Sequence, residues 1–343
     1  MLPHWFQEAV LHDHGDGSVT LLNILPQLFR ISGRPFPFSI EPEIMAREVR
    51  EWFTSGRDIV ERFSVTTGVL QSYEALYLFG KNYVCRRASE GYEYCEMTIA
   101  PQYHTFSGLT EAEVVAAVIE GIKSGESIHP RAEVNLLFSI GREASPEKAV
   151  RLVNVAGRCD RDYVVGIGLV CDEAAHPPEK HVPMFRRAKA LGFKTTCHAG
   201  EWVCEPGQQA DFHRDLPGLI KNIRTAVFGL GADRIGHAIG LPYDPELMKV
   251  VVDRQIGVEG CPGSNFASGL IPDTKCLRIR EMLEAGVLYS LNPDDDLFLP
   301  TLAETFQLCD REYRLTADEK MALRLNALLT KFGNRKLHEF TVI

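Results

Sequence analysis

Two histidines, His12 and His14, stand two residues apart in the apolar segment Leu11-His12-Asp13-His14. Successive side chains of a β-strand point to opposite faces, so this spacing sends both imidazoles to the same side. Imidazole is a common ligand of Zn²⁺ in proteins. A single pair of this kind also arises by chance, so it indicates a metal site only if other ligands join it.

Other segments of the sequence carry groups with matching chemistry. They are His198 and Glu201 in segment 196–201, His237 in segment 234–237, and Asp294, Asp295 and Asp296 at the end of segment 290–296. Singly, each has an ordinary structural explanation, such as a buried histidine or a solvated turn. Several imidazoles with one carboxylate suit a catalytic Zn²⁺ that keeps a position open for water, whose pKa it lowers to ~7. Fe²⁺ or Mn²⁺ could use similar ligands.

The elements that must position these groups alternate between strand and helix. Short apolar and β-branched runs are separated by longer stretches of helical periodicity, which is typical of repeated β-α units. The expected strands are 9–14, 92–99, 134–140, 163–169, 194–199, 234–238, 256–260 and 288–292. This pattern predicts an α/β fold, an eight-stranded (β/α) TIM-type barrel. Each candidate group falls near the C-terminal end of a strand, where such barrels build active sites.

Helices are expected between the strands and at the barrel mouth. The crossover helices are predicted at 111–123, 146–159, 181–191, 216–228, 245–254 and 277–285. Segment 20–90 is too long for one crossover, so we expect it to form a helical lid, inserted after the first strand, that includes helices 43–53 and 70–88. Two or three helices are expected within 303–332. The sequence has no repeat or linker, and 1–343 is predicted to be one domain.

Composition narrows the class of protein. Apolar residues make up 45% of the 343 residues and charged residues 24%, as in a soluble globular protein. The net charge of −9 argues against nucleic-acid binding, which needs basic patches. No segment approaches the roughly 18 to 20 apolar residues of a membrane-spanning helix, and the N-terminus does not resemble a signal peptide.

Nine cysteines without a CxxC pair indicate free thiols in a reducing compartment. We therefore expect a cytoplasmic protein that acts on a small molecule, without a nucleic-acid or membrane partner. Its oligomeric state is left open.

Five segments, in order, resemble the motifs of the adenosine deaminase family, a branch of the metal-dependent amidohydrolases. Segment 12–18 looks like the HxHxDG start of that family, and segment 198–201 is identical to its HAGE motif. Segments 236–237, 259–265 and 290–295 are similar to its GHG, ExCPxSN and SxNxDDP motifs. The resemblance spans nearly the whole chain. It implies a barrel that uses one Zn²⁺ to deaminate adenosine or a related 6-aminopurine nucleoside to the 6-oxo product and ammonia.

The resemblance also implies a role for each matching residue. The metal ligands would be His12, His14, His198 and Asp294, and the catalytic residues Glu201, His237 and Asp294. His237 would orient the attacking water and take its proton, while Glu201 would protonate the purine N1. The substrate-binding residues would be Asp16 at the ribose 5′-hydroxyl, the backbone N–H of Cys171 at N3, and Asp295 at N7.

Departures from the family pattern bear on the substrate more than on the chemistry. Cys171 replaces a glycine, so a side chain enters the pocket, while Gly15 replaces a leucine and Asp296 a proline. Asp16 favours a nucleoside, because relatives that act on free adenine tend to carry glutamate there.

Three alternatives therefore stay open. The substrate could be adenine or a modified, for example N6-substituted, aminopurine. The reaction could be that of another amidohydrolase, although the bridging lysine of two-metal relatives is missing, since no lysine occurs between Tyr163 and Pro178. A nucleoside-binding module without activity ranks last, because neither a ligand nor Glu201 has been lost.

Overall fold

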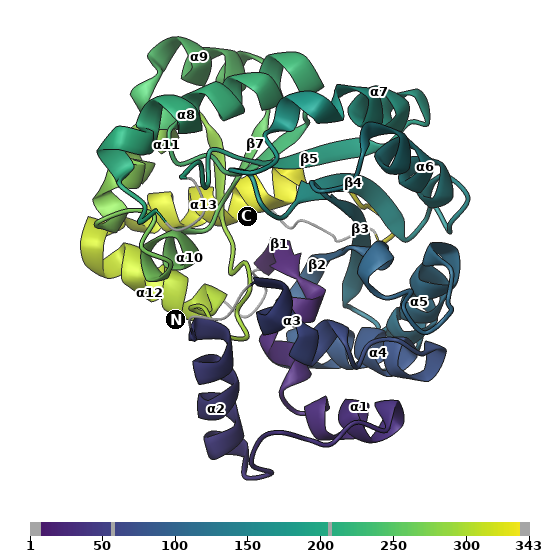
Figure 1. Ribbon diagram of the computed structural model, residues 1–343. Coiled ribbons are helices and arrows are strands. Elements are labelled where there is room, and N and C mark those ends of the chain that lie inside the picture. The colour runs from purple at the N-terminus through teal and green to yellow at the C-terminus, as the bar shows by residue number, and fades with distance from the viewer. Residues whose placement is uncertain (1–7, 56–58, 205–207, 337–343) are drawn as a thin grey trace.

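The computed structural model describes residues 8–55, 59–204 and 208–336. Residues 1–7 lie outside these ranges. The expectation that the N-terminus is not a signal peptide rests partly on them. Eight parallel strands form one sheet in the order of the chain, which confirms the TIM-type barrel (Figure 1). The strands are β1 (Glu8–His14), β2 (Tyr92–Ile99), β3 (Glu133–Gly141), β4 (Val164–Val170), β5 (Lys194–Ala199), β6 (Arg234–His237), β7 (Gly257–Gly260) and β8 (Leu288–Leu291).

Helices fill the crossovers, and their bounds differ from the expected ones by a few residues. They are α5 (Glu111–Ile128), α6 (Pro146–Ala156), α7 (Val182–Ala190), α8 (Phe212–Arg224), α9 (Pro245–Asp253) and α11 (Ile279–Glu284), with α10 (Pro262–Ala267) after β7. A π-helical turn, Thr225–Leu230, extends α8. After β8 come two helices, α12 (Leu302–Tyr313) and α13 (Ala317–Thr330). Thr110 caps α5 through a reciprocal hydrogen bond with Glu113, so that helix begins where the sequence predicts.

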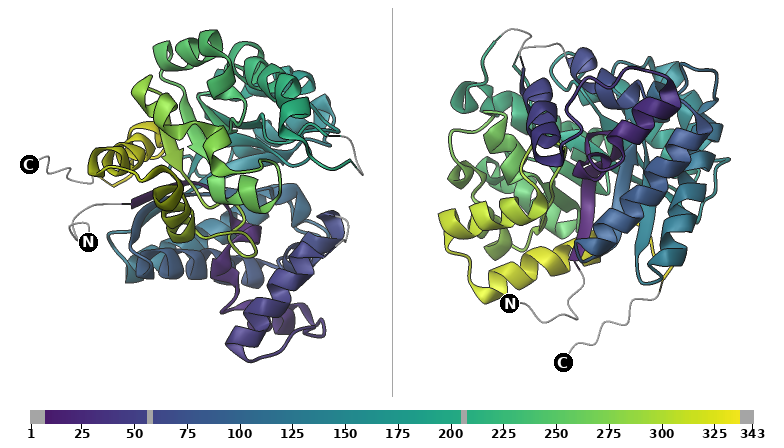
Figure 2. Two further views of the ribbon diagram at one scale, coloured as in Figure 1. Left: turned by 90° about the vertical axis from the view of Figure 1, so that its left-hand side faces the viewer. Right: turned by 90° about the horizontal axis from the view of Figure 1, so that it is seen from below.

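The insertion between β1 and β2 only partly forms the expected lid. It contains α1 (Leu25–Ser32), α2 (Pro42–Thr54), α3 (Ile59–Thr67) and α4 (Tyr73–Ser89). Helix α3 packs on the turn that follows β1, and Phe53 of α2 stacks on Phe298 of the loop after β8 with ring centroids 4.5 Å apart. Helix α4 instead packs along α5 and β2 on the side of the barrel (Figures 1 and 2). The expectation that all of 20–90 covers the mouth is therefore too broad.

The barrel closes without a regular ladder between its first and last strands. Among the described residues, neighbouring strands pair in sequence from β1 to β8, whereas β1 meets the chain after β8 only through an isolated bridge between Asp13 and Asp294. A side chain supports this seam, because Asn292 Oδ1 accepts the backbone N–H groups of Leu11 and His12 at 2.9 and 3.1 Å. The seam thus lies at the segment predicted to bind metal.

The chain after α13 crosses the opposite end of the barrel, as Figure 2 shows. The backbone N–H of Arg335 donates to Glu133 at 3.0 Å, and that of Phe332 to Glu96 at 2.5 Å. The Arg335 guanidinium donates to both carboxylate oxygens of buried Glu126, at 2.7 and 3.1 Å. Each contact pairs a buried carboxylate with a donor, so the segment stabilises the base of the barrel.

Within 8–55, 59–204 and 208–336, no helix combines the length and apolarity needed to cross a bilayer. The assignment of 1–343 to a single domain stays a prediction.

Replacing Arg335 with methionine should lower the free energy of unfolding by about 1–3 kcal/mol, because Glu126 loses a charged donor. Chemical denaturation measures this loss. Arg311→Met is the matched control, since Arg311 pairs only with its neighbour Glu312 on an exposed surface and should lose less than ~1 kcal/mol. Equal losses in the two variants would contradict the assigned role of the segment.

Candidate active site

Four histidines from three strands converge at the C-terminal end of the barrel. His12 and His14 come from β1, His198 from β5 and His237 from β6. Ring centroids lie 4.4 Å apart for His12 and His198, 5.0 Å for His12 and His237, and 5.1 Å for His14 and His198. Ligand atoms of His12, His14 and His198 lie within 4.8 Å of one another, close enough to share one ion.

Asp294 completes this cluster from the loop after β8. Its Oδ1 lies 3.5 Å from Nε2 of His12 and 3.4 Å from Nε2 of His14. Its Oδ2 accepts a hydrogen bond of 2.6 Å from the Ser264 hydroxyl, which fixes the carboxylate. The side chains predicted as metal ligands from β1, β5 and β8 are therefore brought together.

The charges of these groups favour a bound cation. Burial lowers the pKa of His14 to about 4 and that of His198 well below the ordinary histidine value. Both imidazoles are therefore neutral at pH 7 and have a lone pair available for a metal ion. Burial also works against protonation of His12, but hydrogen bonds to Asp294 and Glu259 raise its pKa to about 10. The site is thus built to hold positive charge beside Asp294.

The orientation of His12 is set by a carboxylate behind it. Glu259 Oε2 lies 3.0 Å from His12 Nδ1, and Glu259 is ionised, because Arg234 overcomes the effect of burial and lowers its pKa to about 2. An ionised carboxylate only accepts, so Nδ1–H donates to it, and Nε2 is the atom that offers a lone pair to a cation once that cation has displaced the Nε2 proton. Nε2 is buried and has no hydrogen-bond partner among the described residues. It is thus an available ligand atom.

His237 is oriented in the same way by an amide. Asn265 Oδ1 accepts from His237 Nδ1 at 2.9 Å, which leaves Nε2 free to face Glu201 Oε2 at 3.4 Å. Among the described residues, this Nε2 also lacks a hydrogen-bond partner. This nitrogen, beside the candidate metal position, is placed to accept a proton from a reacting water.

Glu201 is held over the site by another carboxylate, Glu173. The Glu173 oxygens accept the backbone N–H groups of Gly200, Glu201 and Trp202 at 2.7, 2.8 and 3.1 Å. Burial raises the pKa of Glu201, which favours its protonated form. A carboxylic acid facing the cluster can donate a proton to a substrate.

Strained backbone places several of these groups. His237, Asp294 and Cys171 have φ of 63°, 68° and 76°, a left-handed conformation that costs residues other than glycine about 1–2 kcal/mol. Such strain persists only where surrounding contacts enforce it, and it concentrates at functional sites. The φ of Cys171 explains why relatives carry glycine at this position.

Close packing requires glycine at two points of the site. A Cβ at Gly236 would lie 2.8 Å from His12 Cε1 and 3.2 Å from His198 Cδ2. A Cβ at Gly17 would lie 1.7 Å from Asp295 Oδ1. These glycines therefore let the ligand rings and Asp295 approach the backbone.

The predicted substrate-binding residues surround the cluster but are less tightly constrained. Asp295 Oδ1 is buried, with no hydrogen-bond partner in the described part of the chain, and burial followed by the charges of Asp294 and Asp16 raises its pKa well above the ordinary range. Asp16 Oδ2 lies 3.9 Å from Nε2 of buried His104. Cys171 is exposed at the end of β4, with Sγ 3.5 Å from the Tyr103 hydroxyl.

The fit to a metal ion rests on the donor set. The described residues offer the neutral imidazoles of His14 and His198, one ionised carboxylate and the buried Nε2 of His12, whose proton a cation would displace, and this set suits Zn²⁺. Cys261 lies near His12 and Asp294, and burial raises the pKa of its thiol well above the ordinary value.

Sequence reasoning assigned no role to the side chains that orient the cluster. Glu259, Ser264 and Asn265 lie within a recognised motif, and that placement was the only signal for them. Asn292 likewise lies within the motif of segment 290–295. Arg142 carried no signal, although its guanidinium donates to the backbone carbonyl of His198, a candidate ligand.

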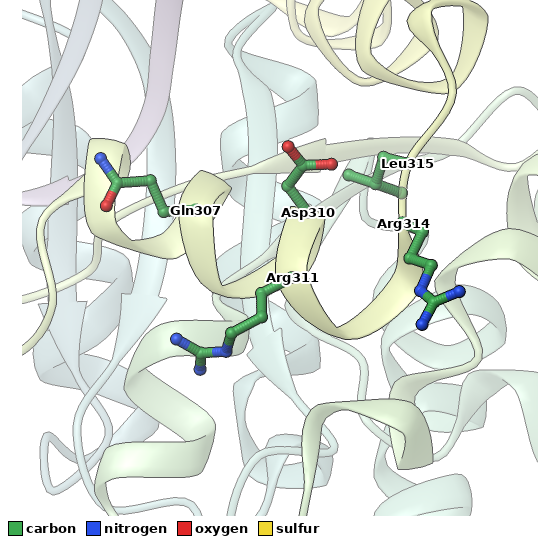
Figure 3. A pocket seen from close by; sticks show the side chains of 5 residues that line it. All are labelled: Gln307, Asp310, Arg311, Arg314 and Leu315. Atoms are coloured by element: carbon green, nitrogen blue, oxygen red, sulfur yellow. The ribbon is translucent and has the colours of Figure 1, made fainter.

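A separate hollow of about 490 Å³ lies on the outer surface along α12 (Figure 3). It is lined by Gln307, Asp310, Arg311, Arg314 and Leu315, none of which belongs to the cluster. Arg311 pairs with Glu312 at 3.1 Å and Asp310 with Lys320 at 2.7 Å.

Known proteins share both sequence and fold with this chain. The family model described as adenosine deaminase matches residues 8–338. An adenosine deaminase of Enterococcus faecalis is 30% identical over 328 residues, covering 94% of this chain and 90% of that protein. An adenine deaminase from Arthrobacter aurescens superposes with a TM-score of 0.78 at 24% identity, over 95% of this chain and 94% of that one.

An Arabidopsis N6-mAMP deaminase superposes with a TM-score of 0.77 at 23% identity, over 98% and 96% of the two chains. These two structures share the fold. The match of the family model over residues 8–338, together with the Enterococcus relative, is decisive: the chain belongs to the adenosine deaminase family of metal-dependent aminohydrolases.

Proposed function

We propose that this protein is a Zn²⁺-dependent hydrolase that deaminates adenosine or a related 6-aminopurine nucleoside, giving the 6-oxo product and ammonia. The observation that carries the proposal is the convergence of His12, His14, His198 and Asp294 on one point, with Glu201 and His237 facing it. A metal of this kind supplies a water of lowered pKa for attack on the purine C6. Zn²⁺, one per chain, fits the donor set best, and Fe²⁺ or Mn²⁺ could replace it.

The chain's own residues manage the protons of this reaction. His237 Nε2 accepts a proton from the attacking water, because Asn265 holds its Nδ1–H and leaves Nε2 basic. Glu201, whose pKa is raised by burial, donates a proton to the purine N1, so negative charge does not build up on the ring. Asp294 helps to orient the water beside the metal. Ammonia leaves from the tetrahedral carbon when the proton held by His237 passes to the amino group, while the C6 hydroxyl gives its proton back to the Glu201 carboxylate and becomes the 6-oxo group.

The substrate is held by groups around the cluster. Asp295, kept neutral by its raised pKa, donates a hydrogen bond to N7, and the backbone N–H of Cys171 meets N3. Asp16 accepts the ribose 5′-hydroxyl. An ionised Asp16 at this position repels a 5′-phosphate, which favours a nucleoside over a nucleotide.

A second substrate class is supported by one observation. Cys171, an exposed residue with a side chain where the family pattern has glycine, narrows the space for the purine in this proposal, and this favours adenine or a modified, N6-substituted aminopurine as the second candidate. The structural neighbours include an adenine deaminase and an N6-mAMP deaminase, so the fold accommodates both. Another amidohydrolase reaction is the less favoured alternative.

The proposed setting is the cytoplasm, and the proposed partner is a small-molecule purine nucleoside or base. All nine cysteines lie in the described residues and are free thiols, as is usual in a reducing compartment.

Replacing His198 with alanine should remove the bound metal and the activity together, because one ligand of the cluster is lost. Metal content by elemental analysis should fall from about one ion per chain towards zero, with no measurable ammonia release. His213→Ala, at an exposed histidine of α8, is the control and should keep both. A metal-free His198→Ala protein with full activity would refute the proposal.

Replacing Glu201 with glutamine should leave the metal content unchanged and lower kcat by about 10²- to 10⁴-fold, since the proton donor is lost but no ligand is. Metal analysis and an ultraviolet assay of adenosine loss measure the two effects on one sample. The control is Glu246→Gln on the exposed face of α9. Normal turnover by Glu201→Gln would rule out its role as proton donor.

Replacing Asp16 with alanine should lower kcat/KM for adenosine by about 10- to 100-fold, the value of a hydrogen bond to a charged group. The same variant should turn over adenine as the wild type does, since adenine has no ribose to contact. Assays with adenosine, adenine, N6-methyladenosine and AMP also rank the substrates, and adenosine is expected to be best. Equal losses for adenosine and adenine would contradict the assignment of Asp16 to the 5′-hydroxyl.

A further inference from the structure

A buried cluster of one cation and two carboxylates lies at the seam of the barrel. Arg87, near the end of α4, donates through Nε and Nη2 to Asp13 Oδ2 at 2.9 and 2.6 Å. The same Nη2 lies 3.1 and 2.9 Å from the two carboxylate oxygens of Asp296. The side chains of Arg87, Asp13 and Asp296 are only 2%, 0% and 0% exposed, so their charges are screened little by water.

Further hydrogen bonds fix this cluster. The Tyr83 hydroxyl, one turn earlier on α4, donates to Asp13, and Arg87 Nη2 also donates to Ser18 Oγ at 3.0 Å. The backbone N–H of Val19 donates to Asp296 Oδ1 at 2.7 Å. Arg87 Nη1 is engaged by Glu90 at 3.0 Å. Together these contacts hold the guanidinium in one orientation.

The two carboxylates of this cluster lie close in sequence to the proposed metal ligands. Asp13 lies between His12 and His14 and points to the opposite face of β1, while Asp296 is two residues beyond Asp294. The ligands proposed from β1 and from the β8 loop thus belong to the two segments that Arg87 joins. Among the described residues, no regular ladder connects these segments but only an isolated bridge, in which Asp294 N–H donates to His12 O at 3.2 Å and His14 N–H to Asp294 O at 3.4 Å, so side-chain contacts supplement it in fixing their register.

We propose that Arg87 is a positioning residue for the metal site: by bridging Asp13 and Asp296 it holds the His12–His14 segment and Asp294 at the spacing that one ion requires. This inference rests on the ligands named under the proposed function. It links α4, a helix outside the barrel, to the geometry of the centre. It also assigns one role, that of binding Arg87, to both Asp13 and Asp296, the residue that replaces the usual proline.

The electrostatic effect of Arg87 has the opposite sign to its positioning effect. If the guanidinium acted only through its charge, its removal would leave two unpaired carboxylates near the site. The site would then bind a cation more tightly. If it positions the ligands, its removal loosens the seam and the ion leaves faster. Second-sphere contacts of this kind change metal affinity by about 10- to 100-fold. The direction of the change therefore separates the two roles.

The test compares Arg87→Met with Arg86→Met, an adjacent arginine that is 43% exposed and pairs with Glu90. Zn²⁺ release from the loaded, full-length proteins is followed with a chromophoric chelator, and the visible spectrum of the Co²⁺-substituted proteins reports ligand geometry. We expect about tenfold faster release and an altered Co²⁺ spectrum for Arg87→Met, with neither change for Arg86→Met. Slower or unchanged release with an unchanged spectrum would overturn the proposal.

Two further variants keep the test informative if Arg87→Met folds poorly. Arg87→Lys keeps the charge but has no planar fork to bridge two carboxylates, so it should also speed release. Asp296→Asn breaks the bridge from the other side and should speed release as well. Combining Asp296→Asn with Arg87→Lys should add little to either change, because both break one bridge. Fully additive effects would count against a shared bridge.

A merely structural role predicts a different result. It would lower the melting temperature of the metal-free proteins while leaving the release rate and the Co²⁺ spectrum as in the wild type. Failure of the proposed function is distinguishable as well, because the wild-type chain would then bind neither ion at the His12–Asp294 cluster, and His198→Ala would leave metal content unchanged.

Discussion

Buried carboxylates need positive charge or hydrogen-bond donors beside them, since an isolated ion in a protein interior costs several kcal/mol. The structure depends on which groups meet this need for each carboxylate. Arg234 serves both Glu96 and Glu259 inside the barrel, and the backbone amides of segment 200–202 serve Glu173. Asp294 has instead two imidazoles and one hydroxyl around it. It is thus the acidic group whose surroundings leave room for a metal cation.

A chain of such charged contacts also fixes the orientation of a side chain in the candidate metal site. Arg234 holds Glu259, Glu259 holds Nδ1 of His12, and His12 then presents Nε2 to the site. Each step removes a rotational freedom from the next side chain, so the ligand atoms are preorganised before an ion binds. The cost appears as strained backbone at His237 and Asp294, which the surrounding contacts sustain.

Contacts in the structure explain the residues that depart from the family pattern. Gly15 stands where relatives have leucine, and a Cβ there would lie 2.6 Å from Phe79 and 2.8 Å from Met97, so this packing admits no larger residue. Asp296 in place of proline meets Arg87, whose other partner is Asp13. Cys171 keeps a conformation that glycine adopts more easily, which leaves an exposed thiol beside Tyr103. The chemical centre is preserved while its supports are altered.

The sequence alone determined the succession of eight strands and their helices, because strand and helix periodicities are local properties of the chain. It also indicated the residues that are proposed to carry the chemistry, since HxH, HAGE and the aspartates after β8 are readable by type and spacing. Only the tertiary structure decided that α4 flanks the barrel rather than covers its mouth, and that the seam closes through Asn292 and Arg87. Partners separated by about two hundred residues, as Arg87 and Asp296 are, leave no local pattern, because folding alone brings them within hydrogen-bonding distance.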